Sequence, residues 1–190
     1  MRKKVGILGG TFNPPHIGHL IIANEVLHAL NLDEVCLMPN ANPPHKEIQN
    51  RVTAEQRRTM VELSIQDVPK LKIETIEIDQ GGTSYTFDTM ELLRRREPET
   101  DFYFIIGGDQ VEDLPKWYRI EDLIQNVHLV GVPRPNKSLE TAYPIVTIEI
   151  PQIDISSTTV RNRITHGETT KFLISDAVRE YIREEKLYEA

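Results

Sequence analysis

Short runs rich in apolar and β-branched residues recur along the chain and predict buried strands. Between them, apolar residues return at intervals of three and four positions, which is typical of helices with one buried face. Leu20, Ala23, Leu27 and Leu30 form such a face and predict a helix that begins near Ile17. The predicted strands are Val5–Leu8, Val35–Met38, Leu71–Ile76, Phe102–Ile106 and Val127–Val132.

Strand and helix alternate throughout the chain. Thr53 is a suitable N-cap for the helical pattern that follows it, and Phe87–Arg96 carries a further helical pattern. This alternation predicts a Rossmann-like, doubly wound α/β fold with a mostly parallel sheet, helices on both faces and a helical C-terminal segment. No repeat or low-complexity linker interrupts it, so we expect one domain over residues 1–190. In such a fold, ligands bind beyond the C-terminal ends of the strands.

Composition narrows the classes of protein to consider. The 190 residues are 39% hydrophobic and 27% charged, as in ordinary globular proteins, and the formal net charge of −7 gives no overall attraction to nucleic acid. Cys36 is the only cysteine, which excludes an internal disulfide framework and a cysteine-rich zinc site. No apolar run approaches the ~20 residues that span a bilayer, and the start of the chain does not resemble a signal peptide. We therefore expect a cytoplasmic protein with no membrane partner.

The first predicted strand is followed by the segment GGTFNPPHIGHL, residues 9–20. Two glycines between a strand and a helix let the backbone approach an anion closely and direct helix N–H groups at it. The spacing matches neither GxxxxGK[ST] nor GxGxxG, and the second predicted strand ends in Met38-Pro39-Asn40 without an acidic residue for a dinucleotide ribose. The loop therefore indicates a phosphate site of another kind.

Two histidines open the helix that follows this loop. His16 and His19 are three positions apart, so they point the same way and can present two donors to one group. They can equally serve as a cap or as packing residues. As a metal-binding pair they would need a third ligand from elsewhere in the chain.

A second polar segment lies far downstream, IDISSTTVRNRI, residues 153–164. One of its hydroxyl groups is expected to cap a helix whose first turn carries Arg161. Hydroxyls, free N–H groups and a guanidinium at one helix start also suit a polyphosphate. Taken alone, this segment is explained by the cap.

Together, GTFNPPHIGH and ISSTTVR resemble the paired signature of the HxGH nucleotidyltransferase superfamily, whose members transfer a nucleoside monophosphate from a nucleoside triphosphate to a phosphorylated acceptor. Within it, the segments GTSYTFDT, FIIGGD and PKWY, at residues 82–89, 104–109 and 115–118, resemble the bacterial nicotinate-nucleotide adenylyltransferases. The likeness runs over nearly the whole chain.

The resemblance implies a catalytic and a nucleotide-binding set of residues. His16, His19, Lys46 and Arg161 are the expected catalytic residues, with Lys46 reaching the phosphates from a basic loop. A carboxylate after two glycines, Asp109, suits a ribose hydroxyl. The expected nucleotide-binding residues are Gly9, Gly10, Thr11, Phe12, Gly107, Asp109, Arg134, Ile155, Ser156, Ser157 and Thr158.

The acceptor is expected in another part of the cleft. Trp117 and Tyr118 follow a strand end and offer a platform for a pyridine ring, although Trp117 can also be a core residue. Thr86 begins a predicted helix, where a hydroxyl and free N–H groups suit a carboxylate. The expected acceptor-binding residues are Ser84, Tyr85, Thr86, Trp117 and Tyr118.

The implied reaction transfers the adenylyl group of ATP to nicotinate mononucleotide, giving deamido-NAD and pyrophosphate in NAD biosynthesis. The acceptor phosphate is already ionised, so its attack on the α-phosphorus needs neither a general base nor a protein nucleophile. Mg²⁺ is expected to arrive with ATP and to be held mostly by substrate oxygens and water, so no metal ligands are assigned to the protein. The expected partners are these small molecules, with a homodimer as one possible assembly.

Other functions remain open at this point. A noncatalytic nucleotide-binding module would bind ATP without releasing pyrophosphate. A Rossmann dehydrogenase would bind NAD as cofactor, and the missing GxGxxG argues against it. A pantetheine-phosphate or cytidylyl transferase would share both signatures but should lack the segments around Thr86 and Trp117.

Overall fold

The computed structural model describes residues 2–41, 52–133 and 139–189. Its centre is one six-stranded parallel sheet with the strand order β3-β2-β1-β4-β5-β6. β1 is the middle of the sheet and pairs with β2 on one side and β4 on the other. The strands are β1 Lys3–Gly10, β2 Glu34–Pro39, β3 Leu71–Ile73, β4 Thr100–Gly107, β5 His128–Val132 and β6 Ile145–Thr147.

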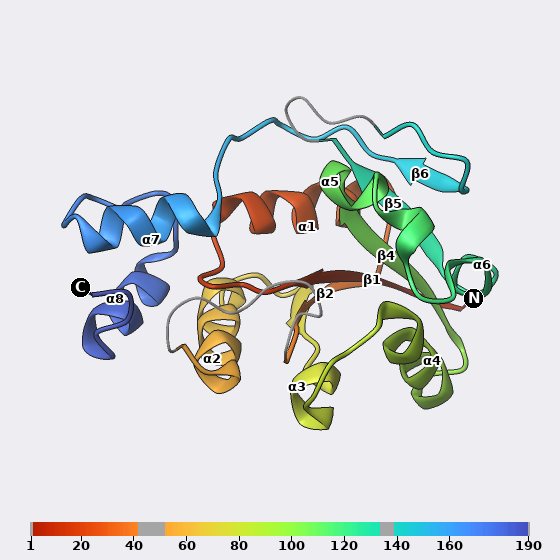
Figure 1. Cartoon of the computed structure of the whole chain (residues 1–190), viewed down its shortest axis with the longest axis horizontal. Helices are drawn as coiled ribbons and strands as arrows, with labels where there is room; N and C mark the ends of the chain where they lie inside the picture. Colours follow the sequence, from red (N-terminus) through yellow and green to blue (C-terminus); the bar gives the residue numbers. More distant parts are fainter. Residues whose placement is uncertain (1, 42–51, 134–138, 190) are drawn as a thin grey trace.

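Helices cover both faces of the sheet, which confirms the predicted Rossmann-like α/β fold (Figure 1). Residues of α1 and α2 pack with Val35 and Leu37 on one face. Residues of α4 and α6 pack with Val5 and Phe102 on the other. The helices are α1 Ile17–Ala29, α2 Ala54–Ile65, α3 Ile76–Gln80, α4 Thr86–Arg96, α5 Gly108–Val111, α6 Ile120–Leu123, α7 Ser157–Thr165 and α8 Asp176–Glu184, with a 3₁₀ turn η1 at Leu114–Lys116.

Two expected helix starts are confirmed by their capping contacts. Thr53 caps α2, because its side chain accepts a hydrogen bond from the N–H of Gln56 at 3.1 Å. Ser156 is the hydroxyl that caps α7, accepting from the N–H of Thr159 at 3.1 Å. Each of these side chains satisfies one backbone donor that the helix start leaves without a partner.

The sequence prediction was wrong at one strand and missed another. The third strand ends at Ile73, and Ile76, expected in that strand, begins α3. The N–H of Glu74 still bonds to the carbonyl of Leu37 at 3.0 Å, so sheet-like bonding continues for one residue before the chain turns. β6 was not predicted, because a three-residue edge strand has too few positions to show alternation.

The C-terminal segment is helical, as expected, and packs at one end of the sheet. α7 and α8 lie together beyond the N-terminal end of α1 in Figure 1. Met60 of α2, Val160 of α7 and Val178 of α8 are fully buried in one apolar cluster. This packing brings the two polar segments of the sequence, which are far apart in the chain, to the same end of the molecule.

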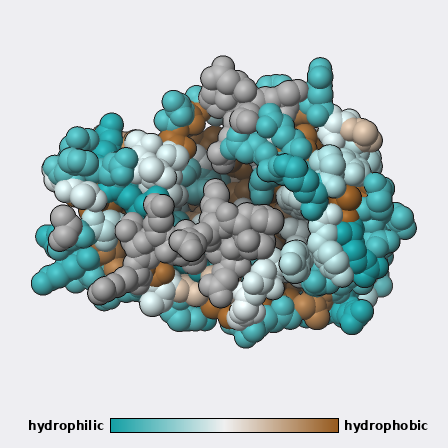
Figure 2. Space-filling model, in the orientation of Figure 1, coloured by the Kyte–Doolittle hydropathy of each residue, from teal (hydrophilic) through white to brown (hydrophobic). Residues whose placement is uncertain are grey.

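The surface is mainly hydrophilic on the face seen in Figure 2, with hydrophobic residues scattered over it. No helix in the described part of the chain has the length and apolar character that crossing a membrane requires.

The organisation of residues 1–190 as one domain stays a prediction.

Candidate active site

The two central strands define where a ligand fits. From β1 the chain crosses to β2 on one side, whereas from β4 it crosses to β5 on the other. In a doubly wound sheet, the crevice beyond the C-terminal ends of two such strands is the usual binding site. Here those ends are Gly10 and Gly107. Both glycines belong to the expected nucleotide-binding set.

The first loop runs from the end of β1 to the start of α1. Phe12, buried in this loop, has φ of 50°, a left-handed conformation that is uncommon for a residue with a large side chain. Gly10 leaves room for it, because a Cβ on Gly10 would lie 3.0 Å from the Phe12 ring. The loop therefore folds closely against itself, with the Phe12 ring packed over Gly10.

The two histidines lie together, as expected. The N–H of His16, the N-cap of α1, donates to Nδ1 of His19 at 3.1 Å. Their rings are stacked with centroids 3.7 Å apart, and Phe12 packs edge-on to His19 at 4.8 Å. The hypothesis of a cap and that of a functional pair are compatible in this arrangement, because one histidine orients the other.

Gly18, between the two histidines, is required by close packing. A Cβ at this position would lie 2.9 Å from the side chain of Ile155 and 3.1 Å from the ring of His16. Ile155 directly precedes the cap of α7. The glycine therefore permits the second segment to approach the histidine pair.

The second segment lies directly on the first loop. Ser157 donates its hydroxyl to the carbonyl of Pro14 at 2.8 Å. Arg161 donates one guanidinium nitrogen to the carbonyl of Asn13 at 2.8 Å and another to the hydroxyl of Thr158 at 3.1 Å. From the sequence we expect both segments to face one ligand, and in the structure they are in direct contact.

At the end of β4, two residues expected near the nucleoside occupy a short helix start. Gly107 is the N-cap of α5, and Gln110 accepts from its N–H at 3.4 Å. Asp109 lies exposed in the first turn of α5. The carboxylate is thus at the same edge of the sheet as the first loop.

The residues expected to hold the acceptor gather at the start of α4. Tyr85 is the N-cap residue and Thr86 the first helical residue. The half-exposed rings of Tyr85 and Tyr118 lie 5.1 Å apart. Trp117 is partly buried and packs edge-on to Phe104 at 6.0 Å, so it is partly a core residue.

A buried carboxylate lies beneath this turn. Glu77 of α3 accepts a hydrogen bond from the hydroxyl of Thr89 at 3.0 Å. Burial raises the pKa of Glu77, while hydrogen bonds from Thr89 and Ser84 oppose the shift. Ser84, expected to bind the acceptor, therefore has a partner within the protein.

Two expected residues, Lys46 and Arg134, lie outside the described residues. Two further residues contact the first loop although the sequence did not indicate them. Arg57 of α2 donates to the carbonyls of Thr11 and Ala41, both at 2.9 Å. Its position three residues before Met60 on the buried face of the helix was the available signal.

The second unexpected residue is Tyr188, whose hydroxyl donates to Oδ1 of Asn13 at 2.6 Å. It is buried in the cluster that contains Met60. No periodic pattern in the sequence marks Tyr188, because it follows the end of α8.

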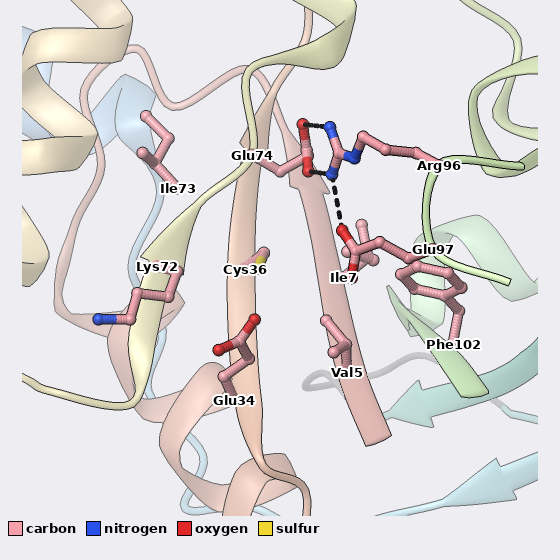
Figure 3. Close-up of a pocket in the computed structure, with 10 residues that line it drawn as sticks. All are labelled: Val5, Ile7, Glu34, Cys36, Lys72, Ile73, Glu74, Arg96, Glu97 and Phe102. Carbon is pink, nitrogen blue, oxygen red and sulfur yellow. Dashed lines mark hydrogen bonds and ion pairs between the residues drawn. The ribbon is translucent and has the colours of Figure 1, made fainter. Parts of the chain in front are cut away.

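A separate cavity of about 350 Å³ lies away from these loops (Figure 3). Val5, Cys36 and Phe102 line it on the sheet, and a pair between Arg96 and Glu74 lies at its edge. It contains no residue of the two polar segments. Among the described residues, no group of three or more His, Cys, Asp or Glu is arranged to hold a metal ion.

Comparison with known proteins gives the family. Residues 7–163 match the family model described as cytidylyltransferase-like. A probable nicotinate-nucleotide adenylyltransferase of Geobacillus thermodenitrificans is 50% identical over 187 residues, which are 98% of this chain and 87% of that relative. The nicotinate-nucleotide adenylyltransferase of Bacillus subtilis is 45% identical over 188 residues, covering 99% of this chain and 100% of the relative.

The fold also matches a solved structure with little sequence identity. Plasmodium falciparum nicotinic acid mononucleotide adenylyltransferase complexed with NaAD aligns with a TM-score of 0.83 and 20% identity, covering 98% of this chain and 97% of that chain. This likeness shows the fold. Since the sequence relatives share about half their residues over nearly the full length, the chain belongs to the cytidylyltransferase-like family and, within it, to the nicotinate-nucleotide adenylyltransferases.

Proposed function

We propose that this protein transfers the adenylyl group of ATP to nicotinate mononucleotide, forming nicotinate adenine dinucleotide and pyrophosphate in NAD biosynthesis. The observation that carries the proposal is the contact of two polar segments: Ser157 and Arg161 of α7 bond to the carbonyls of Pro14 and Asn13 beside the histidine pair. Names and coverage of the sequence relatives support the same reaction.

The triphosphate of ATP is assigned to the first loop and the start of α7. His16 and His19 begin one helix and Ser156 caps another, so two helix N-termini with their partial positive charge serve the same anion. Lys46 and Arg134 are assigned to the same phosphates from the sequence alone. The remaining residues of this set are Gly9, Gly10, Thr11, Phe12, Ile155, Ser157, Thr158 and Arg161, with Gly107 and Asp109 near adenosine.

The chemical step needs alignment and charge stabilisation. An ionised oxygen of the acceptor phosphate attacks the α-phosphorus of ATP, and the bond to the pyrophosphate leaving group breaks. No group on the protein has to remove a proton. His19 and Arg161 donate hydrogen bonds where negative charge increases as pyrophosphate departs.

Mg²⁺ is assigned to the substrate rather than to the protein. The described side chains at the two segments offer mainly donors, hydroxyl and guanidinium groups, rather than the carboxylate oxygens that magnesium prefers. The ion would neutralise phosphate charge when it enters with ATP. The protein's own contribution is to bind and orient the phosphates.

The acceptor is assigned to the start of α4. The hydroxyl of Thr86 and the first N–H groups of the helix are donors, and the helix dipole favours a negative group there. The nicotinate carboxylate fits these donors, and the pyridine ring fits beside Tyr118 and Trp117. We assign Ser84 and Tyr85 to the same pocket. Ser84 contributes by shaping the turn, since its side chain hydrogen-bonds to Glu77.

The proposal extends to the location and partners of the enzyme. A cytoplasmic location and action on small molecules fit the composition, and a net charge of −7 gives no attraction to nucleic acid. A homodimer is a further proposal, which the elution volume of the purified protein tests.

A panel of phosphorylated acceptors tests the function. The purified chain is incubated with ATP, Mg²⁺ and one acceptor at a time, and pyrophosphate is measured. Pyrophosphate release with nicotinate mononucleotide and with no other acceptor of the panel supports the proposal. ATP binding without release would indicate a noncatalytic module. Release with a phosphopantetheine acceptor, or only when CTP replaces ATP, would indicate a different transferase.

A further inference from the structure

Arg57 is a buried cation directly behind the first loop. The residue is 0% exposed, although arginine is almost never fully buried without an acidic partner. Its neighbour Arg58 on the same helix has 39% of its side chain exposed and pairs with Glu55 and Glu62. The two arginines therefore have opposite environments on one helix.

The groups that Arg57 contacts carry no full negative charge. Its guanidinium donates to the carbonyls of Thr11 and Ala41, both at 2.9 Å, and to the side-chain oxygen of Asn40 at 3.4 Å. Its Nε is buried and makes no hydrogen bond to a described residue. Among the described residues, none of the ion pairs includes Arg57. A buried charge compensated only by dipoles is costly.

The contact with Thr11 also fixes the backbone of the loop. The Thr11–Phe12 peptide is trans, so its N–H points away from the carbonyl that Arg57 holds. Phe12 has φ of 50°, a conformation that persists only where surrounding contacts impose it. Arg57 supplies one of these contacts from α2, and thereby sets the direction of the Phe12 N–H.

The buried charge of Arg57 and the fixed direction of the Phe12 N–H would both stabilise an anion bound on the other side of the loop. A polyphosphate would accept from the N–H of Phe12 and supply the negative charge that none of the described residues brings to the buried guanidinium. Asn40 and Ala41 directly follow the last residue of β2, so the same guanidinium also ties the end of that strand to the first loop.

We propose that Arg57 is a positioning residue of the phosphate loop, which fixes the Thr11–Phe12 peptide and holds a buried positive charge behind it for the triphosphate of ATP. This inference rests on the proposed function of the site. It adds a residue that touches no substrate atom. Its effect on ATP is exerted through the loop backbone and through the electric field of the guanidinium.

The test compares Arg57→Met with Arg58→Met, which remove the same charge from neighbouring positions on α2. ATP binding is measured by calorimetry with Mg²⁺ present, and kcat by pyrophosphate release, below the Tm of each variant. For Arg57→Met we expect ATP Kd to rise by about 10-fold or more and kcat to fall, since a preorganised donor and a charge are lost together. For Arg58→Met we expect both values within about twofold of wild type, as for a surface ion pair.

The conservative variant Arg57→Lys keeps the proposal testable if Arg57→Met does not fold. Lysine retains a charge but cannot hold both carbonyls with a planar fork, so we expect an ATP Kd weakened by at least about threefold, with Arg58→Lys unchanged. Wild-type ATP Kd and kcat in folded Arg57→Met, or wild-type values in Arg57→Lys, would overturn the inference. If wild type binds ATP but releases no pyrophosphate, the proposed function fails, while the binding comparison still decides the role of Arg57.

Discussion

The guanidinium of Arg161 donates a 2.8 Å hydrogen bond to the carbonyl of Asn13, 148 positions earlier in the chain. This contact joins α7 to the loop between β1 and α1, so the two halves of the proposed phosphate site are in direct contact. A change in Arg161 is therefore expected to alter the geometry of the loop as well as the charge at the site.

Arg161→Met is expected to lower kcat by about 100-fold or more, because the proposed donor to the leaving phosphates and a tie to the loop are both removed. Arg163→Met is the matched control, since Arg163 lies on the same helix but donates to the carbonyl of Thr169. Steady-state kinetics on both variants, with Tm as a check of folding, measure the difference. Equal kcat values for the two variants would exclude Arg161 from the phosphate site.

His19→Ala is expected to reduce kcat by about 100-fold or more while the fold is kept, because the proposed hydrogen-bond donor to the leaving group is lost. Its ring packs on His16 and Phe12, so a small fall in Tm is also expected. His28→Ala, an exposed position near the end of the same helix, serves as control. A folded His19→Ala enzyme with near-normal turnover would refute the assigned role.

The fold could be predicted because it depends on patterns that extend over many residues. The alternation of strand and helix patterns predicted the sheet and its covering helices. The predicted strand end at Ile76 was wrong, because an apolar residue suits a strand or a helix equally. The paired segments around His16 and Arg161 could be recognised, and their contact followed from the fold.

The supporting residues could not be found in the same way. Tyr188 reaches Asn13 from an irregular segment, and the burial of Arg57 depends on how α2 packs. Such contacts are set by tertiary structure, for which local periodicity gives no signal.

The proposed acceptor pocket predicts selectivity between two mononucleotides that differ only in a carboxylate and an amide. The N-terminus of α4 and the Thr86 hydroxyl offer donors, so an amide would leave one partner unsatisfied, at a cost of about 1 to 3 kcal/mol besides the lost charge-assisted bond. We expect kcat/KM to favour nicotinate mononucleotide by at least ~100-fold, with part of this preference lost in Thr86→Ala.

Competing reactions of the wild type, Thr86→Ala and the exposed-site control Thr83→Ala measure this preference. Equal kcat/KM values for both mononucleotides in the wild type would show that the acceptor binds elsewhere.

The buried thiol of Cys36 makes stability depend on alkaline pH. Burial raises the pKa of Cys36 to about 12. In the unfolded chain a thiol ionises near pH 8.5. The unfolded state therefore loses its proton first, and the free energy of unfolding falls as pH rises between these values.

Between pH 8 and 10 the contribution of this one group to the loss is on the order of 2 kcal/mol. Cys36→Ala should flatten the pH dependence by that amount, because alanine has no proton to lose. Urea unfolding of both proteins over this range measures it. Parallel curves would mean that the thiol ionises equally in both states.

If this protein joins ATP to nicotinate mononucleotide, two products form together, so the decisive measurement is the identity and amount of both in one reaction mixture. We predict that mass spectrometry of the mixture with Mg²⁺ detects nicotinate adenine dinucleotide and pyrophosphate in equal amounts, each increasing as ATP is consumed. Pyrophosphate without the dinucleotide, or no product from correctly folded protein, would contradict the account.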